Sequence, residues 1–534
     1  MRSGRPPRAG ARGTIPAAIS GLALGATFSP YGGPVLPFLA FAPLAAILER
    51  GVGGWGRRPG DLPVPFVQGF VVAAVGHGIG LYWMVPALSW RTPLAVPLYL
   101  LMVGLLGLLG GFACMGATAL RCRRWPVPVA LACCWTGFEW AAAHVPGISY
   151  AWLNAGGSLA WHPAAAAGAE VLGARFLTFW TVAVGAAAGV ACERMLVVGS
   201  GVRARPVLLL LGLVAIPLAA GHLRQRAFEQ GEAVATVAAV QAGPADDDDA
   251  ARQLGRWRAR LRELGGDEPY DVAIFPERFL AAPLKQPGGG RTMDAGREVA
   301  DFAAALGAPV LVGALDTDTG GNGDTLWYNA VFVQSPGDTL SRAYRKIRPV
   351  PGVEGAGWFP GAAFGLANRG YARGRDPRPL PLGRGAVGAM VCYDSAYGET
   401  ARAMVRGGAD WLAVLSNDDW LDPRRPFRTT WAYWQHATHG RLRALENRIS
   451  LVQVAATGHT FAVSPGGRGD VFALDAGEEG VAILAIGRRG AVTLFTRIGD
   501  VLGLACFLVL GGGVALGYAA LPRQPVGKIP PAIP

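Results

Sequence analysis

Eight long apolar segments constrain this 534-residue chain more than any other feature of its sequence. They lie near residues 14–29, 34–48, 64–84, 93–119, 126–145, 171–192, 206–222 and 499–521. A helix of about 20 apolar residues crosses the hydrocarbon core of a bilayer. The first two segments are short and contain proline, so their limits are the least defined. With 51% hydrophobic and only 16% charged residues, the chain also departs from the composition of soluble proteins. We therefore predict a membrane protein with about eight transmembrane helices.

Arginine residues are concentrated in every second connection between these segments, and they set the expected orientation. The clusters are Arg2, Arg5, Arg8 and Arg12; Arg50, Arg57 and Arg58; Arg121, Arg123 and Arg124; and Arg194, Arg203 and Arg205. Cytoplasmic connections carry an excess of basic residues, so the N-terminus is expected in the cytoplasm. We predict a membrane domain of about seven spans at 1–222, an exported domain at 223–498, and a last span with a cytoplasmic tail at 499–534.

The exported segment has a different pattern, with short apolar runs separated by Gly, Pro and Asp. Buried strands are predicted at 233–242, 271–277, 309–315, 328–334, 386–393, 411–417, 450–456 and 481–486. Helical periodicity is found at 251–264, 295–306, 397–407 and 432–447. This alternation predicts an α/β domain in which helices cover sheets, although periodicity does not give the order of the strands.

An acid, a base and a thiol stand out in this segment. Glu277 and Cys392 each end a strand-like run, and Lys346 lies between them in sequence. Cys392 is the only cysteine between residues 223 and 498, and Lys346 is one of three lysines in a chain rich in arginine. A carboxylate can take a proton from a thiol, and an ammonium group stabilises a thiolate or an oxyanion. Taken singly, Glu277 is equally explained as a solvated strand end and Cys392 as packed core.

Other kinds of site have weaker support. We interpret the acidic run 246–249 as a helix start, where carboxylates satisfy free amides. No His and Cys spacing typical of zinc occurs, and we expect His436, His439 and His459 to lack carboxylate companions. Phosphate-loop and dinucleotide fingerprints are also missing. The sequence therefore predicts no metal, no cofactor and no nucleic-acid partner.

Three ordered motifs resemble a known family. The stretches IFPE, YRKIRPVPGVE and VCYDSAYGE resemble the Glu, Lys and Cys motifs of the nitrilase superfamily. The preceding multi-span region and the single span after them resemble the apolipoprotein N-acyltransferases. LSNDDW at 415–420 and QHATHGRLRALENR at 435–448 agree with the same family. The resemblance covers motifs from about Gln241 to Gly467, and the arrangement of spans extends it over nearly the whole chain.

The resemblance implies an αββα nitrilase-like sandwich on the extracytoplasmic face of a bacterial inner membrane. It assigns Glu277 as general base, Lys346 as oxyanion stabiliser and Cys392 as nucleophile. Glu354 would support the site, and the backbone N–H of Tyr393 would complete the oxyanion hole. The implied monomeric enzyme moves an acyl chain from a membrane phospholipid, through a Cys thioester, to the α-amino group of a diacylglyceryl-modified lipoprotein.

Further residues are candidates for lipid contact. Trp358 lies in a Gly-rich and aromatic stretch at 354–374, which is either an interfacial lid or an ordinary solvent loop. Arg424 and Arg425, followed by Trp431, offer phosphate and interface contacts. Surface charge with core aromatic residues is the alternative for these three. His77 and Glu139 lie inside predicted spans, where ionisable groups are costly, and they are expected to contact each other or the lipid path.

The chain departs from the family pattern at several positions. Asp394 follows Cys-Tyr where Glu is common, which shortens a supporting carboxylate. Arg278 follows the base, where it is expected to lower the pKa of Glu277. NDDWLDPRR and AATGHT also differ from the usual motifs. Two other readings remain open: a membrane-tethered carbon–nitrogen hydrolase that uses water as acceptor, and a non-catalytic paralogue that acts as a scaffold.

Overall fold

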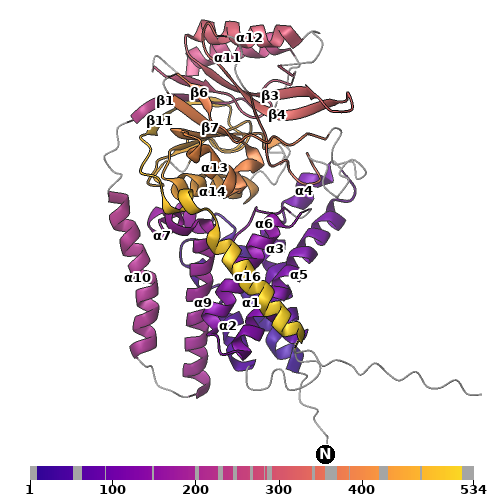
Figure 1. Ribbon diagram of the computed structural model, residues 1–534, viewed down its shortest axis with the longest axis vertical. Helices are drawn as coiled ribbons and strands as arrows, with labels where there is room; N and C mark the ends of the chain where they lie inside the picture. The colour runs from indigo at the N-terminus through magenta and orange to yellow at the C-terminus, as the bar shows by residue number, and fades with distance from the viewer. Residues whose placement is uncertain are drawn as a thin grey trace, which may run out of the picture.

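The protein consists of a helical bundle beneath an α/β domain, as the computed structural model shows (Figure 1). The structure describes residues 9–51, 63–90, 92–146, 149–198, 204–226, 233–243, 249–264, 269–281, 283–284, 292–338, 343–354, 370–383, 385–419, 431–469 and 472–519. Trp358, Arg424 and Arg425 lie outside the described residues.

Eight helices of the bundle match the eight apolar segments in order. They are α1 (Ala9–Thr27), α2 (Ala42–Gly51), α3 (Pro63–Gly80), α5 (Ala95–Cys122), α6 (Val127–His144), α9 (Ala174–Val198), α10 (Ala204–Arg226) and α16 (Val501–Ala519). The short helices are η1 (Leu36–Phe38), α4 (Met84–Ser89), η2 (Gly157–Trp161), α7 (Pro163–Ala166), α8 (Ala169–Leu172) and α15 (Leu494–Ile498). Bundle helices that meet at glycine approach closely, as membrane helices do. A Cβ at Gly69 of α3 would clash with the carbonyl oxygen of Gly110 on α5.

The number of membrane crossings is a separate question from the number of helices. Four stretches within the described helices are long and apolar enough to cross a membrane: Ala95–Cys122, Ala174–Leu196, Val207–Arg226 and Val501–Ala519. Gly13–Thr27 and Val64–Gly80 are apolar but shorter. The second predicted segment forms η1 and the 10-residue helix α2, which is too short to span a bilayer alone. The apolar helices support a membrane protein, while eight crossings stay a prediction.

The α/β domain contains two sheets. The six-stranded sheet has the order β11-β1-β2-β3-β4-β5, and the five-stranded sheet has the order β10-β9-β8-β7-β6. The strands are β1 (Ala233–Gln241), β2 (Val272–Ile274), β3 (Val310–Thr319), β4 (Thr325–Gln334), β5 (Ala343–Arg345), β6 (Leu380–Leu382), β7 (Gly385–Val391), β8 (Trp411–Ser416), β9 (Leu451–Ala455), β10 (Phe461–Val463) and β11 (Gly480–Gly487). Strands β1, β2 and β3 are parallel, as are β7, β8 and β9.

Helices cover the outer faces of both sheets. An apolar core joins the inner faces of the two sheets, and a second one lies between the six-stranded sheet and helices α11 (Ala250–Leu264) and α12 (Thr292–Leu306). Helices α13 (Gly398–Arg406) and α14 (Trp431–Asn447) cover the five-stranded sheet and lie between it and the bundle (Figure 1). The expected αββα sandwich is therefore confirmed, and its five-stranded side faces the membrane helices.

Candidate active site

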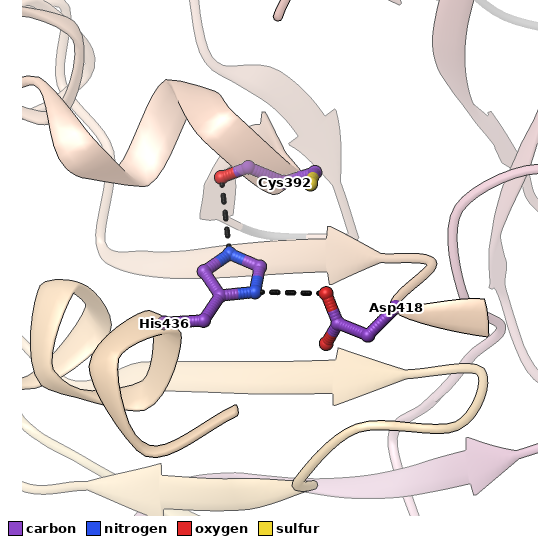
Figure 2. A group of neighbouring side chains, drawn as sticks. All are labelled: Cys392, Asp418 and His436. Carbon is purple, nitrogen blue, oxygen red and sulfur yellow. Dashed lines mark hydrogen bonds and ion pairs between the residues drawn. The ribbon is translucent and has the colours of Figure 1, made fainter. Parts of the chain in front are cut away.

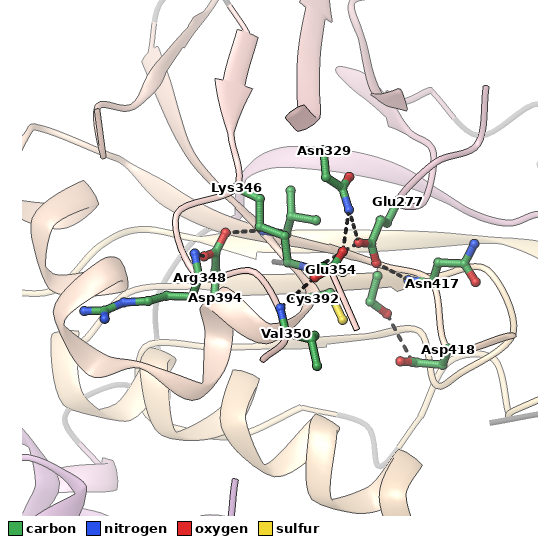
Figure 3. Close-up of polar contacts among 12 residues, drawn as sticks. Glu277, Asn329, Lys346, Arg348, Val350, Glu354, Cys392, Asp394, Asn417 and Asp418 are labelled. Carbon is green, nitrogen blue, oxygen red and sulfur yellow. Dashed lines mark hydrogen bonds and ion pairs between the residues drawn. The ribbon is translucent and has the colours of Figure 1, made fainter. Parts of the chain in front are cut away.

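The candidate residues each follow a strand, although the three strands are not neighbours: β2 and β5 belong to the six-stranded sheet and β7 to the five-stranded sheet. Glu277 lies just beyond β2, Lys346 directly follows β5, and Cys392 directly follows β7 (Figure 3). The Nζ atom of Lys346 is 3.2 Å from Oε1 of Glu277 and 2.7 Å from Oε2 of Glu354. Lys346 is only 2% exposed and Cys392 is 6% exposed. The structure thus brings the predicted acid, base and thiol into one buried site.

Both glutamates are held by a buried asparagine and by main-chain amides. Asn329 of β4 donates from Nδ2 to Oε1 of Glu277 at 2.5 Å and to Oε1 of Glu354 at 3.1 Å. The N–H of Asn417 donates to Oε2 of Glu277 at 2.7 Å, and that of Val350 donates to Oε2 of Glu354 at 2.9 Å. Sequence reasoning missed Asn329. The available signal was an amide in the middle of the apolar run 328–334, since a buried amide needs partners.

The electrostatics of the site suit proton transfer between a thiol and a carboxylate. Burial raises the pKa of Glu277, and the neighbouring Glu354 raises it further against the opposing effect of Lys346. Burial also raises the pKa of the Cys392 thiol well above its usual range, with Glu277 acting in the same direction. Burial alone would lower the pKa of Lys346, but Glu277 and Glu354 together hold it well above its usual range. The resting site therefore contains a neutral thiol, a cationic lysine and a carboxylate of raised basicity.

Arg278 does not have the expected effect on this balance. Its side chain is exposed, and its backbone φ is +53°, which turns the chain away after the base. The pKa of Glu277 is raised, with burial as the largest cause, and Arg278 is not among the groups that shift it, so the expected lowering by Arg278 was wrong.

The nucleophile sits on a strained turn that Asp394 supports. Cys392 has φ of +48°, a left-handed conformation that costs a residue with a side chain about 1 kcal/mol or more. Asp394 accepts hydrogen bonds from the hydroxyl of Tyr344 at 2.8 Å and from the backbone N–H groups of Ile347, Arg348 and Val391. These four hydrogen bonds use both oxygens of the carboxylate. The Asp side chain therefore supports the turn, although it is shorter than the Glu common in the family.

A histidine also contacts the nucleophile, contrary to expectation (Figure 2). Nδ1 of His436 is 3.1 Å from Oδ1 of Asp418, and Nε2 is 3.3 Å from the carbonyl oxygen of Cys392. The expectation that His436 lacks a carboxylate companion was wrong, because Asp418 reaches it from the end of β8. Among the described residues, Cys392, Asp418 and His436 offer possible metal-ligand atoms within 4.8 Å of one another. Both imidazole nitrogens of His436 already have protein partners. We therefore interpret these three residues as part of the active site around the thiol and not as a metal site.

The bundle reaches the residue next to the nucleophile. The hydroxyl of Tyr393 donates to the carbonyl oxygen of Ser149 at 3.0 Å, and that of Tyr397 donates to the same oxygen. The indole of Trp152 stacks on the Tyr393 ring with centroids 5.9 Å apart. The segment between α6 and η2 therefore forms one wall around the nucleophile.

The other predicted residues have separate surroundings. Trp431 begins α14 and packs edge-on against Tyr82 at the boundary with the bundle, with ring centroids 5.4 Å apart. His77 contacts the carbonyl oxygen of Ala73 through Nδ1. Glu139 accepts from the backbone of Ala155 and the side chains of Arg175 and Thr178. Glu139 thus has a cationic partner on α9 that sequence reasoning did not identify.

Comparisons with known proteins agree with both parts of the molecule. The carbon-nitrogen hydrolase family matches residues 236–492, and the apolipoprotein N-acyltransferase N-terminal domain matches residues 20–187. An apolipoprotein N-acyltransferase of Geobacter metallireducens is 27% identical, with 95% of each chain covered. One of Bordetella bronchiseptica is 28% identical, with 95% of this chain and 97% of the relative covered. Among solved structures, an amidase from Nesterenkonia sp. is 17% identical with a TM-score of 0.35, covering 48% of this chain and 92% of that one.

The sandwich, the Glu-Lys-Cys site and the hydrolase match define the class of the α/β domain: it is a carbon–nitrogen hydrolase domain of the nitrilase type. Both domain matches together extend over most of the sequence, and relatives are aligned over nearly its full length. The chain belongs to the apolipoprotein N-acyltransferase family.

Proposed function

We propose that this enzyme transfers an acyl chain from a membrane phospholipid to the α-amino group of a diacylglyceryl-cysteine at a lipoprotein N-terminus. The observation that carries the proposal is the buried cluster of Glu277, Lys346 and Cys392 in a family member whose nucleophile lies beside a membrane bundle. Both substrates have lipid chains, and a site beside the bundle lets those chains stay in the bilayer during the reaction.

In the first half-reaction, Sγ of Cys392 attacks the carbonyl carbon of a phospholipid ester. The thiol proton passes to Glu277, whose raised pKa makes it a stronger base than an exposed glutamate. The ammonium of Lys346 and the N–H of Tyr393 stabilise the tetrahedral oxyanion. The C–O bond of the ester then breaks, the leaving lysophospholipid oxygen takes the proton from Glu277, and Cys392 carries the acyl chain as a thioester.

In the second half-reaction, the neutral α-amine of the acceptor attacks the thioester carbonyl. Glu277 takes a proton from the nitrogen as the C–N bond forms. The C–S bond breaks, the thiolate of Cys392 takes the proton held by Glu277, and the product is an amide. A thioester suits this order of events because it holds the acyl group covalently and an amine opens it readily.

We propose that this chemistry takes place on the extracytoplasmic face of the inner membrane, in a monomer. The arginine clusters support this orientation, because they lie in every second connection, on the side of the N-terminus. Basic connections are cytoplasmic, so the α/β domain lies on the opposite side. The α13 and α14 layer would then face the outer surface of the bilayer.

The test is a two-stage labelling experiment with the purified protein in detergent. The enzyme is first incubated with a phospholipid bearing an alkyne-tagged acyl chain and is then chased with a synthetic diacylglyceryl-cysteine peptide. We expect label to leave the enzyme and to appear on the peptide as an amide, which resists neutral hydroxylamine.

The matched control is the same peptide with an acetylated α-amine. It is expected to leave the label on the enzyme, because it offers no nucleophilic nitrogen. Release of free fatty acid at equal rates with both peptides would favour the hydrolase reading. Failure to label the folded enzyme with any phospholipid would favour the non-catalytic reading.

A glycine behind the base provides a further prediction. A Cβ at Gly313 of β3 would clash with the carbonyl oxygen of Pro276 and would lie 2.7 Å from Cα of Glu277. Gly313→Ala is therefore expected to displace the base and to slow acyl-enzyme formation about tenfold, because small misplacements of reacting groups are costly. The rate of alkyne labelling measures this. Gly321→Ala is the control, since nothing lies within 4 Å of its added Cβ, and an equal rate loss in both variants would contradict the prediction.

A further inference from the structure

The imidazole of His436 lies between two groups that can only accept hydrogen bonds (Figure 2). One is the carboxylate of Asp418, 3.1 Å from Nδ1, and the other is the carbonyl oxygen of Cys392, 3.3 Å from Nε2. A neutral imidazole has one N–H donor and one lone pair, so it satisfies only one of these contacts. The doubly protonated form donates to both. The geometry therefore favours an imidazolium beside the nucleophile.

The surroundings of His436 agree with a retained positive charge. Its side chain is fully buried, and Asp418 supplies a charge partner that accepts a second hydrogen bond from the hydroxyl of Ser416 at 3.1 Å. Burial alone would lower the pKa of His436, but Asp418 and the Cys392 carbonyl together raise it. The other groups that face it are the carboxylate of Glu277, the ring of His439 and the indole of Trp152.

The residue before His436 anchors its helix in the bundle. Nε2 of Gln435 donates to the carbonyl oxygens of Phe28 at 3.1 Å and Gly80 at 2.9 Å, which lie at the ends of α1 and α3. Oε1 of Gln435 accepts from the indoles of Trp83 at 3.0 Å and Trp152 at 2.8 Å. All four hydrogen-bonding positions of this amide are used by residues outside the α/β domain. The position of α14, and with it the imidazole, is fixed relative to the membrane helices.

The carbonyl that His436 contacts belongs to the strained residue of the site. Cys392 has φ of +48°, so its thiol direction depends on contacts that hold this turn. Ser395 donates to the same carbonyl from Oγ at 2.8 Å, within the turn itself. His436 supplies the contact from outside the turn, on an element anchored in the bundle.

We propose that His436 is a positioning residue for acyl transfer: bridging Asp418 and the carbonyl oxygen of Cys392, it holds the nucleophile in its left-handed turn and links that turn to the membrane bundle through Gln435. This role rests on the proposed function of Cys392. His436 does not contact the acyl group; it acts through the main chain of the nucleophile.

The experiment compares two polar replacements that keep different halves of the bridge. The amide nitrogen of glutamine in His436→Gln reaches the place of Nε2 and keeps the donor to Cys392. In His436→Asn the amide nitrogen corresponds to Nδ1 and keeps only the contact with Asp418. Alkyne labelling is followed over time at several phospholipid concentrations. We expect His436→Asn to lower the maximal rate about tenfold with an unchanged half-saturating concentration, and His436→Gln to stay within about threefold of wild type.

The matched control is His439→Asn, three residues along the same helix. His439 is also buried and also packs against Trp152, with ring centroids 5.0 Å apart. We expect its maximal rate to stay within about threefold of wild type. Thermal unfolding is measured for all variants. Equal rates for His436→Gln and His436→Asn, or rate losses that follow melting temperature in all three variants, would overturn the positioning role.

The pH profile provides a second measurement that needs only the milder variant. The raised pKa of His436 means that the bridging imidazolium is present at low pH and is lost as pH rises through that pKa. The labelling rate of wild type should then fall on the alkaline side, and His436→Gln should lack this fall because an amide does not titrate. An identical alkaline fall in both proteins would overturn the proposal. Absence of label on wild type would overturn the proposed function itself, and the role of His436 with it.

Discussion

Replacing Cys392 with alanine is expected to remove all hydroxylamine-sensitive acyl label from the enzyme. Sγ of Cys392 is the only atom of the proposed triad that forms a bond to the acyl group. No residual thioester is therefore expected when it is absent. The loss should exceed about 10³-fold, the scale typical for removal of a covalent nucleophile. The measurement is in-gel detection of the alkyne label after incubation with tagged phospholipid, before and after neutral hydroxylamine.

Other cysteines supply the control for this result. Cys122 and Cys192 are exposed thiols in or beside the bundle, where a reactive lipid could acylate them without catalysis. The double variant Cys122→Ala/Cys192→Ala is expected to keep the full label of wild type. Label that survives in Cys392→Ala and disappears in the double variant would show that acylation is unspecific, and it would sink the thioester mechanism.

The layers of the fold were predictable from the sequence, while the pairing of strands was not. Long apolar segments and short apolar runs separate the bundle from the α/β domain without further information. The order of the sheets depends on contacts between distant segments, such as the antiparallel pairing of β1 with β11, which joins Ala233 to Gly487. Strands β5, β6 and β10 have three residues each, too few for a period of two to be recognised.

The site was predictable where a residue ends a recognisable strand or is of a type that is rare in the chain. Glu277 and Cys392 carried that signal, and Lys346 was distinguished by the scarcity of lysine. Their partners carried a weaker signal: Asn329 is one of two amides in an otherwise largely apolar strand and is 1% exposed in the structure. His436 and Asp418 meet only because α14 packs against β9 and the turn that follows β7, which brings the imidazole to the residue just beyond β8. The bridge between them depends on tertiary packing, which a local motif does not encode.

Lys346→Met is expected to lower the rate of acyl-enzyme formation by about 10²–10³-fold, as loss of a preorganised charge at a developing oxyanion does. In the wild-type protein, Nζ of Lys346 is 3.2 Å from the carboxylate of Glu277 and 2.7 Å from that of Glu354. The same change therefore leaves the two carboxylates buried together without their shared cation. Breaking a buried ion pair by removing one partner typically costs about 3–5 kcal/mol in the free energy of unfolding. Both effects are measurable, the first by labelling and the second by denaturant unfolding in detergent.

A second variant separates the catalytic effect of Lys346 from its effect on stability. Lys346→Met/Glu354→Gln removes one of the two carboxylates that compete for the missing cation, so most of the lost free energy of unfolding is expected to return. The labelling rate is expected to stay low, because the site still lacks a positive charge beside the acyl carbonyl. Recovery of both stability and rate in the double variant would mean that Lys346 serves only to neutralise the glutamates. Recovery of stability alone would assign the ammonium to the oxyanion, which is why a compact point charge occupies this position in a chain that otherwise uses arginine.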